Sequence, residues 1–315
     1  MEDKHYPRLG LSPNQTTTNV DAGSELVSVF LKEEGVALFI VLICMMEDGG
    51  FVMSYWIVLL VSLLACSVGF HMYIWFFSVG YGLAIAAIGV ALAVGFHSQM
   101  VLPEWIACGL LFVFGLRLSG YLLIREMKNT IYRKVLNPEM ERSKRMPIFA
   151  KIAMWLTCGM LYTLMTIPLY FRLNNGAPAD AMLWIGLAVM VCGVVLEATA
   201  DLQKTAAKKK NSRRFVDTGL YRFVRCPNYL GELLLWLGML LTGTTALRGP
   251  LQWILALLGF ILIVWVMFSG ARRLELRQDK NYGADPEYQK YVRSVPILIP
   301  FIPLYSVKKY KFLMA

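Results

Sequence analysis

The stretch Leu251–Ser269, LQWILALLGFILIVWVMFS, runs for 19 residues without a charged side chain. A helix needs about 20 apolar residues to cross the hydrocarbon core of a bilayer, so this stretch predicts a membrane-spanning helix. Arg272 and Arg273 follow it almost at once and mark where the helix leaves the membrane.

Apolar runs of this kind recur along the chain, which is 57% hydrophobic and only 17% charged. A soluble domain of this size carries about a quarter charged residues. The other runs are Val52–Phe70, Tyr73–Phe96, Trp105–Ile124, Ile148–Phe171, Ala181–Ala200 and Tyr229–Leu247. The sequence therefore predicts an all-α, multi-pass transmembrane bundle of about seven helices. A short apolar run, Gly35–Met46, leaves open whether one extra N-terminal helix spans or lies at the interface.

The runs divide the chain into regions. The expected regions are a polar N-terminal tail (1–34), N-terminal membrane helices (35–125), a basic loop (126–147), a C-terminal catalytic-like membrane domain with its loops (148–300) and a basic C-terminal tail (301–315). The first 25 residues have no apolar centre behind a basic start, so no cleavable signal is expected. Six cysteines are scattered without a CxxC pair, which argues against a zinc or other metal site and against a disulfide framework.

The net charge of +10 is concentrated in alternate loops. Basic residues cluster in 125–151, 204–225 and 272–293, whereas the loops 172–180 and 242–250 hold one arginine each. The positive-inside rule places the basic loops and the C-terminus on the cytoplasmic side of the membrane. The sequence leaves open whether this membrane is a bacterial inner membrane or the endoplasmic reticulum. The same charges favour contact with anionic membrane lipids. No basic stretch alternates with exposed aromatic residues, which argues against nucleic acid as a partner, and nothing indicates the oligomeric state.

Ionisable residues inside a span are costly and point to function. Glu197, Asp201 and Lys204 are spaced at i, i+4 and i+7, so they share one face of a helix. A salt-bridge ladder worth about 0.2–0.5 kcal/mol per pair explains Asp201 with Lys204. It explains Glu197 poorly, because that residue lies deeper in the apolar run.

The segment Gly219–Glu232, GLYRFVRCPNYLGE, carries the densest signal. Pro227 suits the first turn of a helix. The free N–H groups of that turn form an anion site, and Arg222 and Arg225 stand just before it.

Polar residues also recur at helical spacing. Asn228 and Glu232 are four residues apart, so an amide and a carboxylate project together into the bundle. On an earlier helix, Arg117, Tyr121 and Arg125 recur every fourth residue. The two guanidiniums favour the phenolate of Tyr121, which makes it a candidate proton donor. A topological arginine with an interfacial tyrosine is an equally good reading.

These motifs resemble the C-terminal signature of the steroid 5α-reductase-like membrane family, including its bacterial-type branch, in patches from Arg117 to Pro300. The motifs that carry the resemblance are Glu197-x3-Asp201-x-Gln203-Lys204, Gly219-Leu220-Tyr221-Arg222, Arg225-x-Pro227-Asn228-Tyr229-x-Gly231-Glu232, Arg117-Leu118-x2-Tyr121-Leu122-x2-Arg125 and the tail from Leu274-Glu275 to Ile299-Pro300. The resemblance implies a seven-helix membrane fold that binds NADPH from the cytoplasm. It also implies hydride addition to a carbon–carbon double bond conjugated to a carbonyl, in a steroid-like or other lipid substrate.

Carried over residue by residue, the resemblance implies two sets of site residues. Tyr121 and Glu232 would be catalytic, with Glu232 near the nicotinamide. The cofactor would be held by Glu197, Asp201, Lys204, Arg222, Arg225, Asn228, Tyr229, Arg272 and Arg273.

The chain departs from the family pattern at two places. Cys226 stands where the bacterial branch usually has a histidine, and Tyr73–Leu83 lacks the acid that relatives often carry near a tryptophan. Two alternatives stay open. One is an isoprenylcysteine carboxyl methyltransferase-like enzyme using S-adenosylmethionine, which shares the Arg-x-Pro-x-Tyr-x-Gly run but is disfavoured by Asn228 and Glu232. The other is a non-catalytic lipid-binding protein on the same fold.

Overall fold

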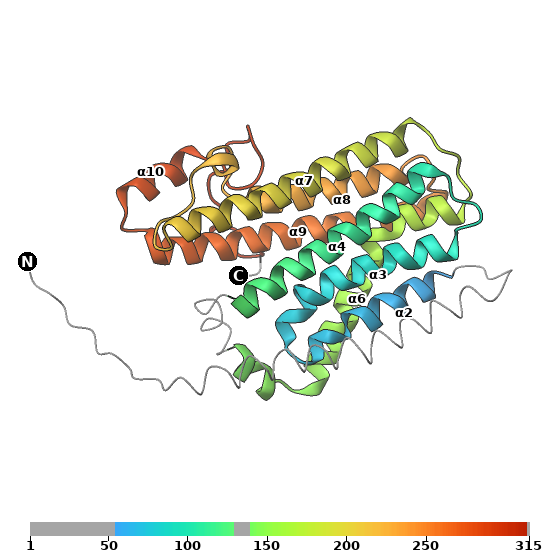
Figure 1. Cartoon of the computed structure of the whole chain (residues 1–315), viewed down its shortest axis with the longest axis horizontal. Helices are drawn as coiled ribbons and strands as arrows, with labels where there is room; N and C mark the ends of the chain where they lie inside the picture. Colours follow the sequence, from blue (N-terminus) through green and yellow to red (C-terminus); the bar gives the residue numbers. More distant parts are fainter. Residues whose placement is uncertain (1–53, 129–138, 314–315) are drawn as a thin grey trace, which may run out of the picture.

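The computed structural model describes residues 54–128 and 139–313, and all regular structure within them is helical (Figure 1). The helices are α2 (Tyr55–Cys66), α3 (Val79–Gly95), α4 (Leu102–Lys128), α6 (Ile148–Asn174), α7 (Ala181–Lys210), α8 (Pro227–Gly243), α9 (Gly249–Tyr282) and α10 (Pro286–Ser294). Helices α2 to α4 and α6 to α9 run roughly side by side, and α10 lies beyond one end of the bundle (Figure 1).

Each of the seven predicted spans corresponds to one helix of this bundle. Four of them, α4, α6, α7 and α9, are long and apolar enough to cross a membrane, and α2 and α3 are shorter apolar helices. The prediction of an all-α, multi-pass membrane fold is confirmed. The possible extra helix Gly35–Met46 and the polar tail 1–34 lie outside the described residues.

The second predicted span, Tyr73–Phe96, is wrong as a single helix. A 3₁₀ turn, Tyr73–Phe77, is separated from α3 by Ser78, whose φ of −128° and ψ of −91° are not helical. The break lets the buried Phe76 ring lie over Gly69, where an added Cβ would come within 2.0 Å of the ring. The first span is likewise shorter than predicted, because α2 ends at Cys66 and a 3₁₀ turn follows.

Three helices, in contrast, extend beyond their predicted ends. Helices α4, α7 and α9 continue to Lys128, Lys210 and Tyr282. Their extensions are rich in lysine, arginine, glutamate, leucine and alanine, which are strong helix formers, so the helices persist after the apolar runs end. Helix α8 ends earlier than predicted, at Gly243, and α10 was not predicted at all.

Paired glycines set how closely the helices approach. A Cβ at Gly193 of α7 would lie 2.5 Å from the Gly231 carbonyl oxygen of α8, and one at Gly115 of α4 would lie 2.2 Å from the Gly82 carbonyl oxygen of α3. Only a residue without a side chain allows such contact. As a result Glu197, one turn after Gly193, lies directly against α8.

At the end of the bundle opposite α10, a buried arginine is fully paired. Arg172 of α6 donates to Asp180 at 2.7 Å, to the Thr242 carbonyl at 2.5 Å and to the Thr245 hydroxyl at 2.6 Å. Burial alone would raise the pKa of Asp180, but hydrogen bonds from Thr245 and Arg172 lower it to about 2. This network ties α6 and the start of α7 to the loop after α8.

The C-terminal residues fold back onto the bundle. Val307 and Leu313 are buried in an apolar cluster with Cys226 and Ala271. The region predicted as a basic tail, 301–315, is therefore packed against α8 and α9 as far as residue 313.

Candidate functional site

A tyrosine and a glutamate meet in the interior of the bundle. The Tyr81 hydroxyl of α3 donates to Glu232 Oε1 of α8 at 2.7 Å, and both side chains are buried. The Trp236 indole N–H, one turn after Glu232, donates to the same hydroxyl at 2.9 Å. One phenol is thus held between a donor and a carboxylate from α8.

Aromatic rings fix the position of this phenol. The Tyr81 ring packs 4.8 Å from Tyr162 of α6 and 6.2 Å from Phe114 of α4, measured between centroids. The Tyr162 hydroxyl donates to the Phe76 carbonyl at 2.7 Å, so its own hydrogen bond is directed away from Glu232. The hydroxyl of Tyr81 is the one that reaches the acid.

A second polar cluster joins α4 to α7. Arg117 forms an ion pair with Glu197 and another with Asp201, the latter at 3.2 Å. The spacing of Glu197, Asp201 and Lys204 suggested a ladder within α7, but the cation that pairs with both acids comes from the neighbouring helix. Glu197 Oε2 and Arg117 Nε are buried without a hydrogen-bond partner in the described part of the chain.

Basic groups gather where α4, α7, α8 and α9 emerge near α10. Lys204 lies within electrostatic range of Arg125, Asp201 and Arg277. Tyr229, at the start of α8, lies within range of Arg273 and Arg277. These residues form the basic mouth, defined here as Arg125, Lys204, Tyr229, Arg273 and Arg277.

Asn228 lies between the basic mouth and the interior pair. It belongs to the first turn of α8, and Glu232 is one turn deeper on the same face. Its Oδ1 atom is buried and accepts no hydrogen bond from the residues that the structure describes. Buried polar atoms are nearly always paired, so Asn228 Oδ1 is a candidate acceptor for a hydrogen bond from a ligand, and its predicted role in cofactor binding stays a prediction.

Arg225 and Arg272 contact the C-terminal segment. Arg225 is buried, pairs with Glu275 at 3.0 Å and also donates to the Tyr305 carbonyl. Arg272 donates to the carbonyls of Lys308 and Leu313 at 3.2 and 3.1 Å. Arg222, by contrast, is exposed. Cofactor binding by these three arginines stays a prediction.

Tyr121 is placed away from the interior pair. Its hydroxyl lies 3.2 Å from the Thr205 hydroxyl on α7, and Arg125 lies over its ring at 5.7 Å. Its catalytic role stays a prediction. Sequence reasoning missed Tyr81, whose signal was a lone phenol between two glycines, Gly80 and Gly82, in an otherwise apolar helix.

The structure shows the surroundings of Cys226 and Trp75, the two places where the sequence departs from the family pattern. Cys226 is the N-cap of α8, its N–H donates to the Ile297 carbonyl at 3.0 Å, and burial raises the pKa of its thiol to about 12. It therefore packs as a neutral group. The Trp75 indole donates to Glu126 of α4 at 3.1 Å, so an acid reaches this tryptophan from another helix.

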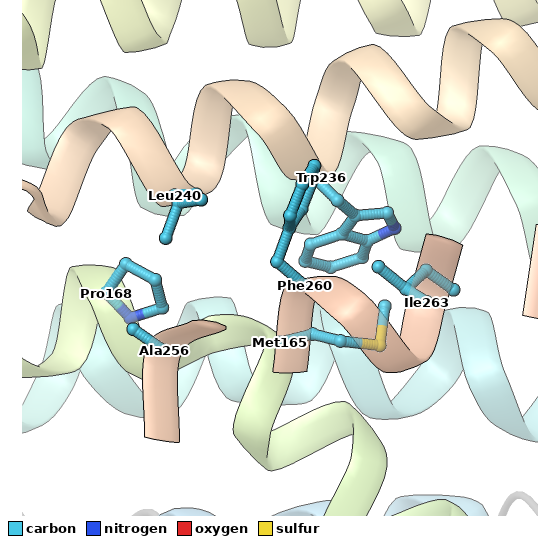
Figure 2. A pocket seen from close by; sticks show the side chains of 7 residues that line it. All are labelled: Met165, Pro168, Trp236, Leu240, Ala256, Phe260 and Ile263. Atoms are coloured by element: carbon cyan, nitrogen blue, oxygen red, sulfur yellow. The ribbon is translucent and has the colours of Figure 1, made fainter. Parts of the chain in front are cut away.

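Side chains of α6, α8 and α9 surround a narrow apolar space, and Trp236 is one of them (Figure 2). No part of this space is wide enough for a water molecule. Its lining is Met165, Pro168, Trp236, Leu240, Ala256, Phe260 and Ile263. Trp236 lines this space and also donates to Tyr81, so the apolar space lies next to the polar pair.

Comparisons with known proteins give one family model and two curated relatives. A family model described as "Protein of unknown function (DUF1295)" matches residues 66–295. A very-long-chain enoyl-CoA reductase of Dictyostelium discoideum is 32% identical over 151 residues, which are 47% of this chain and 44% of that protein. An uncharacterised protein of Schizosaccharomyces pombe is 32% identical over 161 residues, 44% of this chain and 45% of that protein. The chain thus spans less than half the length of these curated relatives.

Proposed function

This chain belongs to the DUF1295 family, which is a steroid 5-alpha-reductase-like family, and we propose that it is a membrane-embedded NADPH-dependent reductase. It reduces a carbon–carbon double bond conjugated to a carbonyl in a lipid. The observation that carries the proposal is the buried Tyr81 hydroxyl, held by Glu232 and Trp236 beside a narrow apolar space.

The proposed chemistry needs a hydrogen-bond donor at the carbonyl oxygen. When bound, NADPH supplies the hydride, which goes to the carbon β to the carbonyl. Negative charge then develops on the carbonyl oxygen, and the Tyr81 O–H, which donates to Glu232 in the described structure, would turn to donate a hydrogen bond there. Trp236 and Glu232 hold the phenol in position. The α carbon takes up a proton, so the product is the saturated carbonyl compound.

The polar groups near the mouth suit a dinucleotide. Lys204 and Arg273 would hold phosphate groups, because both lie in the basic mouth. The unpaired Asn228 Oδ1 would accept from an amide N–H, such as that of a nicotinamide carboxamide. Glu197 and Asp201 would accept from ribose hydroxyls.

Arg225 and Arg272 have a different role in this proposal. Both are held by the C-terminal segment, so they position that segment over the start of α8 and the end of the apolar part of α9. The basic mouth, and with it the C-terminus, would face the cytoplasm, because basic loops stay on that side.

The substrate class follows from the apolar space and from the relative. The space beside Trp236 is too narrow for water, so in this proposal its apolar side chains move apart to admit a hydrocarbon chain or a flat ring system. The D. discoideum relative is named for an enoyl-CoA, a thioester, and the steroid 5α-reductase-like family that the motifs resemble is named for a steroid substrate. Both contain the same conjugated carbonyl, so we propose that unit as the reacting group.

The test uses the full-length protein purified in detergent. Calorimetric titration with NADPH and with S-adenosylmethionine is expected to show binding of NADPH alone, and turnover is measured with a trans-2-enoyl-CoA and with a 3-keto-4-ene steroid. Asn228→Ala is expected to weaken NADPH binding, and Glu232→Ala to lower turnover. Binding of S-adenosylmethionine alone would favour the methyltransferase, and binding of neither ligand would favour a lipid-binding protein.

A further inference from the structure

A groove on the C-terminal cap takes no part in the proposed reaction. It contains about 250 Å³ of space, and its lining includes Phe223, Phe301 and Ile302, with Arg222 at its edge. Pockets for whole drug-sized ligands usually measure about 300–1,000 Å³, so this groove suits one segment of a long, chain-like ligand.

Hydrogen bonds connect the groove to the end of the apolar part of α9. Helix α9 carries no charged residue from Gly249 to Ala271, so its apolar part ends at Arg272. Arg272 is hydrogen-bonded to the Leu313 carbonyl, and one turn later Glu275 pairs with Arg225, which holds the Tyr305 carbonyl of the groove. One turn is about 5.4 Å. The head-group layer extends about 5–7 Å beyond each side of the hydrocarbon, so a groove connected to α9 one turn after Arg272 is expected near that layer.

Phe301 stands at the mouth of the groove in an unfavourable conformation. It has a φ of +66° and a side chain that is 99% exposed. A residue with a Cβ rarely adopts this conformation, because the Cβ approaches the backbone oxygen. Its neighbours Phe223 and Ile302 are 68% and 49% exposed. Exposed aromatic residues at this depth are typical of groups that insert among lipids.

The charge at the groove favours an anionic lipid. Arg222 lines it, and the exposed Lys309 and Lys311 lie further along the C-terminal segment, which Arg272 contacts through the Leu313 carbonyl. Phe312, between Lys311 and the buried Leu313, is 70% exposed. Basic residues beside exposed aromatic side chains match a phosphate above an acyl chain.

From this placement we propose that the groove binds one anionic phospholipid of the surrounding membrane. Its phosphate contacts Arg222, and the first part of one acyl chain lies between Phe223 and Phe301. The proposal does not depend on the reductase activity.

The test reconstitutes the full-length protein in bilayers of phosphatidylcholine with one fifth phosphatidylglycerol and counts retained lipids by native mass spectrometry. One phosphatidylglycerol per chain is expected. Arg222→Gln is expected to lower its occupancy about fivefold, from about 1 kcal/mol per basic residue. Phe301→Gly is expected to lower it about tenfold or more, from the lost apolar contact. Glycine accepts the positive φ, so this variant keeps the fold.

Arg213→Gln is the matched control, since it removes one exposed positive charge outside the groove. It is expected to retain the lipid. Wild-type retention in both groove variants would overturn the proposal. So would equal retention of phosphatidylcholine, or displacement by millimolar inorganic phosphate. A dimer that Phe301→Gly dissociates would instead assign the groove to a second copy of the chain.

Discussion

Replacing Tyr81 with phenylalanine removes one hydroxyl from the interior of the bundle and leaves the ring packing in place. That hydroxyl donates to Glu232 at 2.7 Å and accepts from Trp236 at 2.9 Å. Two hydrogen bonds are lost, and a buried carboxyl loses a donor, so the free energy of unfolding should fall by about 1–3 kcal/mol. If the hydroxyl also acts on the substrate carbonyl, kcat should fall about 10²–10³-fold, as when an oxyanion donor is removed.

The assay follows NADPH oxidation in single- and multiple-turnover experiments, together with NADPH binding and thermal unfolding in the same detergent. Tyr162→Phe is the matched control. Its ring lies 4.8 Å from that of Tyr81, and its buried hydroxyl donates a hydrogen bond to the Phe76 carbonyl. The control should lose stability by a similar amount, about 1 kcal/mol per hydrogen bond, and keep turnover near the wild-type value.

Two results would refute this reasoning. If Tyr81→Phe kept wild-type turnover, the phenol would be part of the packing alone. If Tyr81→Phe and Tyr162→Phe lost turnover to the same extent, the loss would reflect disturbance of the aromatic cluster and not a missing donor.

Three further predictions concern the bundle. Gly193→Val should lower the free energy of unfolding by about 1–3 kcal/mol or more, because the valine side chain would meet the α8 backbone. Gly120→Ala is the control and should not lower the free energy of unfolding, because the space around Gly120 is open; thermal unfolding measures both. The pKa of Asp180 is lowered to about 2, so its ionised form stabilises the folded protein fully above about pH 4. This stabilisation is lost as the pH falls through about 2. Asp180→Asn should remove this part of the pH dependence of the unfolding free energy, as measured by unfolding curves at different pH values. Arg117→Met should destabilise by about 3–5 kcal/mol, because two buried acids lose their cation, and adding Glu197→Gln should restore part of the loss in a double-mutant cycle.

The helices were predictable from the sequence, but their ends and breaks were not. Uncharged runs such as Leu251–Ser269 identify membrane helices because the bilayer requires about 20 apolar residues. The same criterion takes the first charged residue as the end of a helix. It misses the continuation of α9 from Arg272 to Tyr282, where helix-forming residues and contacts such as the Arg225–Glu275 pair maintain the structure. The break at Ser78 depends on where Phe76 packs, which the hydropathy of the run does not encode.

The candidate site was predictable only in part, for a related reason. Asn228, Glu232, Glu197 and Asp201 stand out because polar groups in an apolar run are rare. Tyr81 does not stand out in this way, because a tyrosine is common in membrane helices. Apolar residues surround these helices on every side, so periodicity does not reveal which face meets which neighbour.

Three buried charges in the described part of this bundle are paired with groups from a different segment. Arg117 of α4 meets acids of α7, Glu232 of α8 meets a phenol of α3, and Arg172 of α6 meets Asp180 before α7. Sequence reasoning within one helix looks for partners three or four residues away, as it did for the α7 acids. In the membrane interior, however, a charge without a partner is costly enough that a neighbouring helix must supply one. The residue to look for is therefore a complementary group at the same depth on another helix.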